Sequence, residues 1–296
     1  MVKKIKLLII AVAFTVVLSG CVVKENGGQA DPKDIEEQAL KNMEGVDSYT
    51  ADFSMEMNMS AEDKSQDSMT LNVNAEGDAT VDRTNKKLKM NMSMKMFGIT
   101  INNIVYVVNG TQYMGTRSPG ISAGIDWKKK QVPVNEFNQQ DQLEMQKKML
   151  NLSNTTVLGT ETLDGVETYK IKLEPNKEKY RSLLLDQMSS ISTGKDVTED
   201  QIKALKFQNI TGIQWISKKD KRIRKASSDV EFSISPKSSA VKSKPGKLKY
   251  DMETTVKVNE YDPSVDIILP EDAKNATSVT ARGPVSGSQG EMKSLP

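Results

Sequence analysis

Residues 88–96 read Leu-Lys-Met-Asn-Met-Ser-Met-Lys-Met, and residues 53–59 read Phe-Ser-Met-Glu-Met-Asn-Met. In both stretches an apolar residue alternates with a polar one, and successive side chains of an extended chain point to opposite faces. A clean period of two is typical of antiparallel strands that have one buried face and one solvated face. The two stretches therefore predict a β-sheet whose buried face is rich in methionine.

The same alternation continues along the chain on both sides of these stretches. Asn109-Gly110 and Asp164-Gly165 interrupt it with dipeptides that favour two-residue hairpin turns. Such turns connect antiparallel neighbours, so the sheet is expected to consist largely of hairpins. Further strands are predicted at 69–75, 99–108, 155–162, 166–173, 209–217, 223–235 and 247–261.

A helix is predicted before the first strand. Asp31 is a favoured N-cap residue, Pro32 is favoured at the first helical position, and Gly45 offers a C-terminal stop. Between them, apolar residues recur at helical spacing at Ile35, Ala39, Leu40 and Met43. Shorter helices are predicted in the middle of the chain, within 142–150, 180–191 and 198–205.

The start of the chain predicts export. Three lysines within residues 3–6 precede an apolar stretch at 7–18. Twelve residues are too few to cross a bilayer as a helix, which takes about 20, and they fit a secretory signal. Ser19-Gly20-Cys21 then resembles the lipobox of prokaryotic lipoproteins, which implies cleavage before Cys21 and attachment of diacylglycerol to its thiol. A plain signal peptide with an incidental cysteine, or an uncleaved anchor, is the alternative.

This pattern divides the chain into four segments. They are a lipoprotein signal peptide at 1–20, a tether at 21–30, one β-rich domain at 31–272 and a disordered tail at 273–296. Removal of the signal takes away three lysines and no acids, which changes the formal net charge from +2 to −1. The expected location is the extracytoplasmic face of the cell membrane, to which the lipid on Cys21 would anchor the protein.

The composition excludes several functions. The 296 residues include no histidine and one cysteine. A disulfide framework, a His/Cys zinc site and a Ser-His-Asp triad are therefore impossible within one chain. No motif for Ser/Lys or paired-carboxylate catalysis is present, so an enzyme is the least expected class, and no cofactor is expected.

The order of the elements resembles the LolA/LppX superfamily of lipid-handling proteins, and the lipobox favours the LppX/LprG lipoproteins within it. Two local patterns contribute, residues 105–113 followed by Trp127 and residues 261–262 followed by 267–273. The resemblance covers roughly residues 31–275. It implies an α+β fold in which a strongly curved, incompletely closed antiparallel β-sheet, a half-barrel, has helices covering its concave face and encloses an apolar cavity for acyl chains.

Seven of the 16 methionines lie on two predicted strand faces. Methionine is flexible and polarisable, so it suits a lining that has to fit acyl chains of varied shape. The residues that we expect to line a lipid-binding cavity are Phe53, Met55, Met57, Met59, Leu71, Val73, Leu88, Met90, Met92, Met94 and Met96. Two alternatives stay open: the faces pack the solid core of a non-catalytic surface lipoprotein, or their Met-x-Met thioethers bind Cu(I).

A second candidate region is basic. Residues 217–249 contain 11 Lys and Arg against three acids. On an anchored protein such a segment can rest against anionic lipid head groups, at about 1 kcal/mol per well-placed charge. The alternative is a solvated turn with a lysine-protected strand edge, and nucleic acid is not an expected partner of an exported protein. The residues concerned are Lys218, Lys219, Lys221, Arg222, Arg224 and Lys225.

Overall fold

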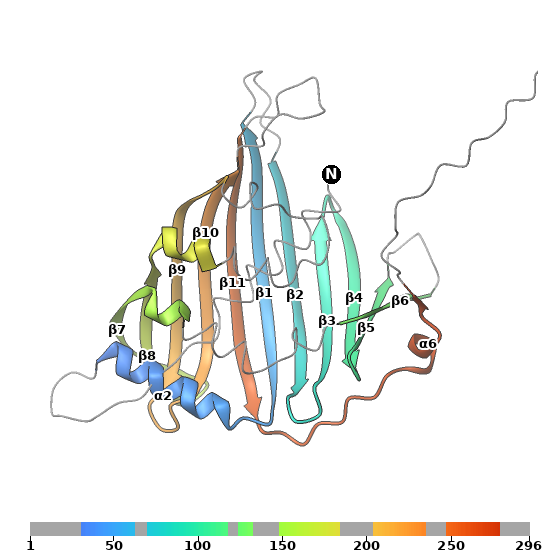
Figure 1. Cartoon of the computed structure of the whole chain (residues 1–296), viewed down its shortest axis with the longest axis horizontal. Coiled ribbons are helices and arrows are strands. Elements are labelled where there is room, and N and C mark those ends of the chain that lie inside the picture. Colours follow the sequence, from blue (N-terminus) through green and yellow to red (C-terminus); the bar gives the residue numbers. More distant parts are fainter. Residues whose placement is uncertain are drawn as a thin grey trace, which may run out of the picture.

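The structure is a computed structural model of the chain that describes residues 31–62, 70–117, 124–132, 148–183, 204–234 and 247–278. In these residues twelve strands form a single sheet (Figure 1). Helix α2 (Pro32–Glu44) crosses one end of the sheet, and α6 (Glu271–Lys274) lies at the opposite edge beside β6. Residues 148–151 and 177–183 are also helical.

The strands follow the predicted alternation closely. In chain order they are β1 (Ser48–Glu62), β2 (Thr70–Asp82), β3 (Lys87–Met96), β4 (Ile99–Val108), β5 (Thr111–Arg117), β6 (Asp126–Gln131), β7 (Ser153–Leu163), β8 (Val166–Pro175), β9 (Leu205–Ser217), β10 (Ile223–Ile234), β11 (Lys247–Tyr261) and β12 (Thr277–Ser278).

Strand β1 joins two parts of the sheet, of which one contains β2 to β6 with β12 and the other contains β7 to β11. The strand order is β12-β6-β5-β4-β3-β2-β1-β11-β10-β9-β8-β7, so most neighbours are also consecutive in the chain. The exceptions are β1 with β11, which pair antiparallel with Phe53 opposite Val256, and β12 with β6, which pair in parallel. Because β7 and β12 are the two edges, the sheet stays open, and the predicted large, incompletely closed antiparallel sheet is confirmed.

The predicted hairpin turns are confirmed. Asn109 and Gly110 have φ angles of 50° and 69°, and Asp164 and Gly165 have 47° and 79°. Positive φ at both central residues matches the right-handed twist of the flanking strands. Phe97 and Gly98, between β3 and β4, have the same signs, at 52° and 73°.

Helix α2 begins and ends as its sequence predicts. The Asp31 side chain accepts a hydrogen bond from the Lys33 backbone N–H at 2.9 Å, and Gly45 is the C-cap residue. Ile35 and Ala39 are fully buried against Ile171 of β8 and its neighbours. No helix among the described residues is both long and apolar enough to span a bilayer.

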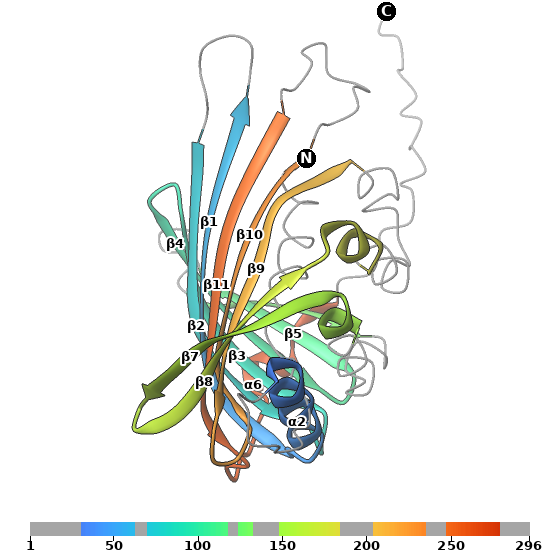
Figure 2. The ribbon, with the colours of Figure 1, turned by 90° about the vertical axis from the view of Figure 1, so that its left-hand side faces the viewer.

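The sheet has two faces of different character. We call the face against which α2 packs the inner face and the opposite one the outer face. Figure 2 shows α2 and the helical residues 148–151 and 177–183 on the same side of the curved sheet. Their side chains pack against β8 to β10. Helices therefore cover part of the inner face, and helical cover over the rest of it stays a prediction.

The folded part continues past the predicted boundary at residue 272. Ala273 and Ala276 are buried against Tyr106 and Trp127 on the outer face of β4 and β6. Trp127 Nε1 donates a hydrogen bond to Asp272 at 2.8 Å, and β12 then adds to the edge of the sheet. The C-terminal segment thus belongs to the domain as far as Ser278, a correction of the predicted tail.

Candidate functional site

The side chains predicted to line a cavity lie on one continuous part of the inner face. The register places Met57 of β1 opposite Val73 of β2, and Val73 opposite Met96 of β3. The next two rows repeat the arrangement, because Met55 and Phe53 align through Ala75 and Gly77 with Met94 and Met92. We call the inner-face side chains of β1, β2 and β3 the methionine half.

Side-chain length alternates across the methionine half. Strands β1 and β3 carry methionine at three and four successive inner positions, whereas β2 between them carries Val73, Ala75, Gly77 and Ala79. The short side chains of β2 are mostly buried, while the methionines of β3 are only half-buried. The long side chains of β1 and β3 therefore border a line of short side chains along β2, which we call the low strip.

Gly77 is the lowest point of this strip. A Cβ atom placed there would lie 2.0 Å from the Asn91 backbone oxygen and 2.7 Å from a ring carbon of Phe53. The Phe53 ring thus lies across the glycine, and a larger residue at this position cannot be accommodated without a shift of the backbone.

The other half of the inner face is aromatic. Phe232 of β10 stacks on Tyr250 of β11 with ring centroids 4.7 Å apart and planes 7° apart. Phe207 of β9 contacts Phe232 at 5.9 Å, and Tyr180 of the helical residues 177–183 meets Phe207 edge-on at 5.4 Å. We call the inner face of β9, β10 and β11 the aromatic half; it forms one cluster with Met57 and Val73.

A group of polar side chains is buried where α2 meets the aromatic half. Glu36, Gln214, Ser228 and Thr254 are 0%, 1%, 4% and 6% exposed. Within the described residues their side-chain oxygens, and the Gln214 amide nitrogen, have no hydrogen-bond partner. Burial raises the pKa of Glu36 well above its ordinary value. This group was not predicted from the sequence. Strand alternation could have indicated one member, because it places Gln214 on the same face as the apolar residues Ile210 and Ile216.

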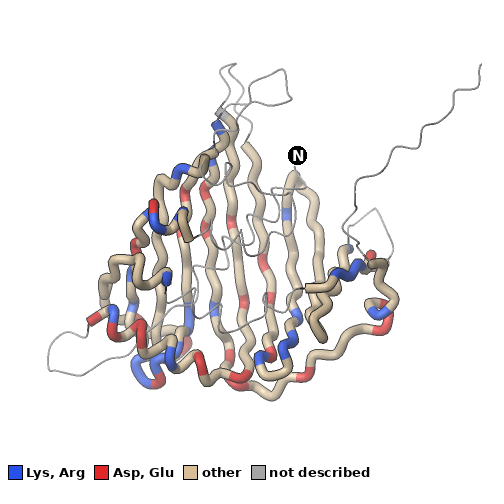
Figure 3. Tube along the Cα trace, in the orientation of Figure 1, with Lys and Arg blue, Asp and Glu red and all other residues tan. Residues whose placement is uncertain are grey.

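The basic segment makes contacts within the chain. Figure 3 shows Lys and Arg gathered around the β9–β10 turn. Arg222 pairs with Asp262 at 3.0 Å, and Lys218 approaches Glu167 at 3.6 Å. Lys225 lies 4.6 Å from the centre of the Trp215 ring.

Two further cations of the basic segment make cation–π contacts with aromatic rings of other strands. Lys221 lies 4.9 Å from the centre of the Tyr169 ring, and Arg224 pairs with Asp220 and lies 5.6 Å from the centre of the Tyr261 ring. These contacts give the segment a role in joining strands. Binding of anionic head groups by Lys219 and its neighbours stays a prediction.

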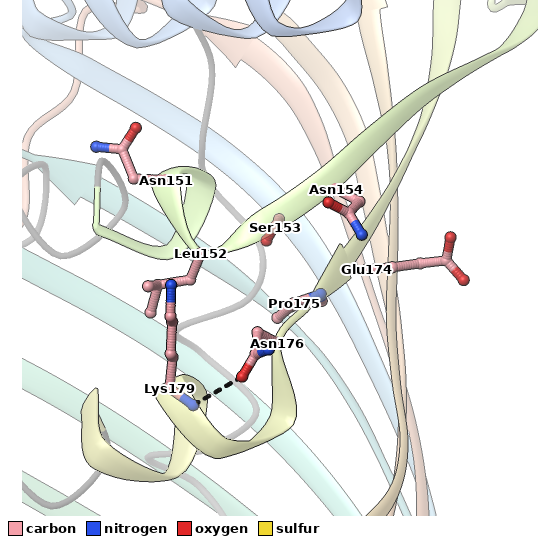
Figure 4. Close-up of a pocket in the computed structure, with 8 residues that line it drawn as sticks. All are labelled: Asn151, Leu152, Ser153, Asn154, Glu174, Pro175, Asn176 and Lys179. Carbon is pink, nitrogen blue, oxygen red and sulfur yellow. Dashed lines mark hydrogen bonds between the residues drawn. The ribbon is translucent and has the colours of Figure 1, made fainter.

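Two cavities among the described residues differ in their lining. One, of about 460 Å³, lies where residues 151–154 meet residues 174–179. Figure 4 shows that Asn151, Asn154 and Glu174 point in different directions, so the polar groups do not converge. The other, of about 420 Å³, is lined by Asp52, Glu76 and Asp78 of the outer face and also by Phe53 and Gly77 of the methionine half.

Metal ligands do not gather in the part of the chain that the structure describes. No group of three or more His, Cys, Asp or Glu side chains that could hold a metal ion occurs there. The methionines of β1 and β3 are separated by β2, so roughly 10 Å lies between these strands. Cu(I) binding by thioethers stays an alternative hypothesis. The signal peptide, Cys21 and the tether lie outside the described residues, and lipidation of Cys21 stays a prediction.

The family model described as "Family of unknown function (DUF6612)" matches residues 31–278. No curated protein matches the sequence. The match begins at Asp31 and ends with β12, so it spans the same part of the chain as the sheet and its helices.

Three solved structures illustrate what the fold is similar to. The lipoprotein LppX of Mycobacterium tuberculosis is 13% identical, covering 79% of this chain and 96% of that one, with a TM-score of 0.39. LprF of Mycobacterium bovis is 13% identical, covering 80% and 95%, with a TM-score of 0.40. A LolA superfamily protein of Nitrosomonas europaea is 10% identical, covering 81% and 96%, with a TM-score of 0.22. These structures include members of the superfamily that the sequence resembles.

Proposed function

The chain belongs to DUF6612, a family of unknown function, and we propose that it is a lipoprotein of the extracytoplasmic membrane face that binds an acyl-chain ligand. The ligand would lie on the methionine half, along the low strip formed by β2. The role is binding or carriage rather than catalysis. Cys21 would supply the membrane anchor through its attached lipid.

One observation carries this proposal: seven methionines flank a strip of small side chains on one face of three adjacent strands. Methionine is a poor choice for a rigid core because its side chain underspecifies packing. The same freedom lets a surface adjust to chains that differ in length and unsaturation. The half-buried methionines of β3 also leave apolar surface that a bound chain would remove from water.

Lipid extraction tests the proposal directly. The full chain is purified from membranes and extracted with organic solvent, which leaves a covalently attached lipid on the protein, and the extract is analysed by mass spectrometry. We expect acyl lipid in an amount comparable to that of the protein. An extract without lipid would overturn the proposed function.

A matched pair of variants locates the ligand. Met94 faces the inner side of β3, whereas Ser93, next to it in the same strand, faces the outer side. Met94→Glu places a carboxylate where the acyl chain would lie, and burying an unpaired charge is strongly unfavourable. We expect Met94→Glu to lose most of the extracted lipid and Ser93→Glu to retain it, with both variants shown to be folded by circular dichroism.

A solid core is the second candidate, because Met57 and Val73 are buried in the same cluster as Tyr250 and Met252. In that case the methionines would only complete the packing of the domain. The two candidates differ in the Met94→Glu experiment. A solid core predicts no lipid in the wild-type extract and a large loss of stability in the variant.

A further inference from the structure

The buried polar group beneath α2 needs an explanation of its own. Glu36, Gln214, Ser228 and Thr254 lie within an otherwise apolar face, and none of them finds a hydrogen-bond partner among the described residues. A buried polar group left without a partner destabilises the folded state because it has lost its hydrogen bonds to water. Buried polar atoms in proteins are normally paired, so a cluster of unpaired ones indicates a missing partner.

Three of the four side chains, those of Gln214, Ser228 and Thr254, are neighbours on the inner face. We call these three the row. Ser228 of β10 lies directly opposite Thr254 of β11, and side chains at such positions have Cβ atoms about 5 Å apart. Gln214 of β9 faces Ala226 and is therefore the diagonal neighbour of Ser228. Gly212, which faces Ser228, contributes no side chain. The row therefore brings three polar side chains together beside a position that has no side chain.

Glu36 belongs to the same region through α2. Its chain neighbour Ile35 packs with Ile171 and Ala226 in one buried cluster. These two residues are the partners of Gln214 in β8 and β10. Glu36 itself is fully buried, so its side chain belongs to the packed region in which α2 covers the sheet.

The row also borders the methionine half. Thr254 lies opposite Met55 in the pairing of β11 with β1. An acyl chain on the strip along β2 would therefore run beside Met55 of β1, and Thr254 lies on the next strand beyond β1. A polar end of the same molecule can reach the row without leaving the inner face.

We propose that Glu36, Gln214, Ser228 and Thr254 form a subsite for the uncharged, oxygen-bearing head group of an acyl lipid, such as a glycerol ester or hydroxyl. This subsite rests on the proposed function, since it holds the polar end of the same ligand. Two hydroxyls, an amide and a carboxyl supply both donors and acceptors, as ester and hydroxyl oxygens require.

The charge of the site selects against a phosphate head group. The buried polar and charged side chains of the described residues include no lysine or arginine. A phosphate is bound where cations or several donors neutralise it, and a carboxyl in the site opposes a second negative charge. Burial raises the pKa of Glu36, which favours its neutral form as a donor to a neutral ligand.

The test compares probes that share acyl chains and differ in head group. Full-length protein is incubated with vesicles containing dioleoylglycerol, dioleoyl phosphatidic acid or the headless hydrocarbon 9-octadecene, and retained probe is measured after separation. We expect dioleoylglycerol to be retained at least ~10-fold better than the other two probes, a ratio below the ~10⁴–10⁵ reached by sites built to bind a substrate hydroxyl.

A matched double variant assigns the preference to the row. Ser228→Ala with Thr254→Val removes two polar groups from the inner face, and Ser227→Ala with Thr255→Val makes the same change at the adjacent pair on the outer face. We expect the inner pair of substitutions to lose the ~10-fold preference while hydrocarbon retention is unchanged. The outer pair should behave as wild type.

The outcomes separate the two proposals. Failure of every acyl probe to bind would overturn the proposed function together with the subsite. Acyl binding without a head-group preference, or with the preference intact in the inner double variant, would overturn the subsite alone and indicate that water occupies the row. A preference for phosphatidic acid would overturn the proposal that the subsite binds an uncharged head group.

Stability gives an independent readout. If the row serves a ligand, the lipid-free inner double variant unfolds at the same or a higher denaturant concentration than wild type, because unpaired polar groups have been replaced by apolar ones. A purely structural role predicts a lower midpoint, and that result would overturn the subsite.

Discussion

The aromatic half and the methionine half lie on the same face of one sheet, yet they are built differently. In the aromatic half the rings of Phe207, Phe232 and Tyr250 contact one another in defined geometries beneath helical residues. In the methionine half long flexible side chains from β1 and β3 flank the short ones of β2. The first half has the features of a fixed core, and the second has those of an adaptable surface.

This difference shows how one sheet can combine stability with adaptability. Rings and branched side chains lose little conformational freedom on burial, and aromatic pairs add about 0.5–1.5 kcal/mol beyond their buried area. Methionine contributes apolar surface without fixing its own position. A protein that has to stay folded while its ligand changes gains from placing the two kinds of residue in separate regions.

The largest expected effect contrasts truncation in the two halves. Phe232→Ala removes a side chain that is 5% exposed and stacked on Tyr250, and we expect it to reduce the free energy of unfolding by about 3–5 kcal/mol. Met94→Ala removes a half-buried side chain, and we expect a cost below about 1.5 kcal/mol. Urea unfolding of the lipid-free proteins measures both, and equal costs would contradict the division into a fixed and an adaptable half.

Enlarging a small residue probes the same contrast with a smaller effect. Ala226 lies fully buried under α2 beside Ile35, so Ala226→Leu should overpack the contact and cost about 1–3 kcal/mol. Ala75 lies between Met55 and Met94, and these side chains can move aside. We expect Ala75→Leu to cost less than ~1 kcal/mol and to reduce the amount of extracted lipid. A larger loss of stability for Ala75→Leu than for Ala226→Leu would show that the methionine half is the tighter one.

Glu36 provides a pH-dependent test at the border of the aromatic half. Its pKa is raised in the folded protein by burial, so at low pH folded and unfolded chains are both protonated. As the pH rises, the unfolded chain releases the proton first, and the folded state becomes relatively less stable until the folded pKa is passed. Glu36→Gln cannot titrate, so its stability relative to wild type should increase over the pH range above the ordinary glutamate pKa of about 4.3. A stability difference that is constant across this range would contradict the raised pKa.

The local features of the fold could be predicted from sequence, because each depends on residues that are close together in the chain. Asp31 with Pro32 predicted the start of α2, and Asn109-Gly110 predicted a hairpin turn, as the structure confirms. Alternation also predicted that Met90, Met92 and Met94 share a face. The period of two fixes that grouping whatever the neighbouring strands are.

The remaining features depend on contacts between distant residues. Nothing local to Phe53 indicates that Val256 lies opposite it, and this pairing is what joins the two halves. Glu36 and Glu37 look alike in sequence, yet only Glu36 is buried, because α2 docks on β8 to β10. Glu36, Gln214, Ser228 and Thr254 come from α2, β9, β10 and β11, so they become a group only after the sheet has formed.

The smallest expected effect concerns the turn at one end of the methionine half. Phe97 has a φ of 52° and is 68% exposed, whereas the equivalent position in the β7–β8 turn holds Asp164, a residue that tolerates positive φ. Phe97→Asn should therefore raise the free energy of unfolding by about 0.5–1 kcal/mol, measured by urea unfolding. Phe97→Ala keeps the unfavourable conformation and serves as the control, with no gain expected. Equal destabilisation by both substitutions would show that the ring itself stabilises this end of the sheet, and that the methionine half has a fixed contact there.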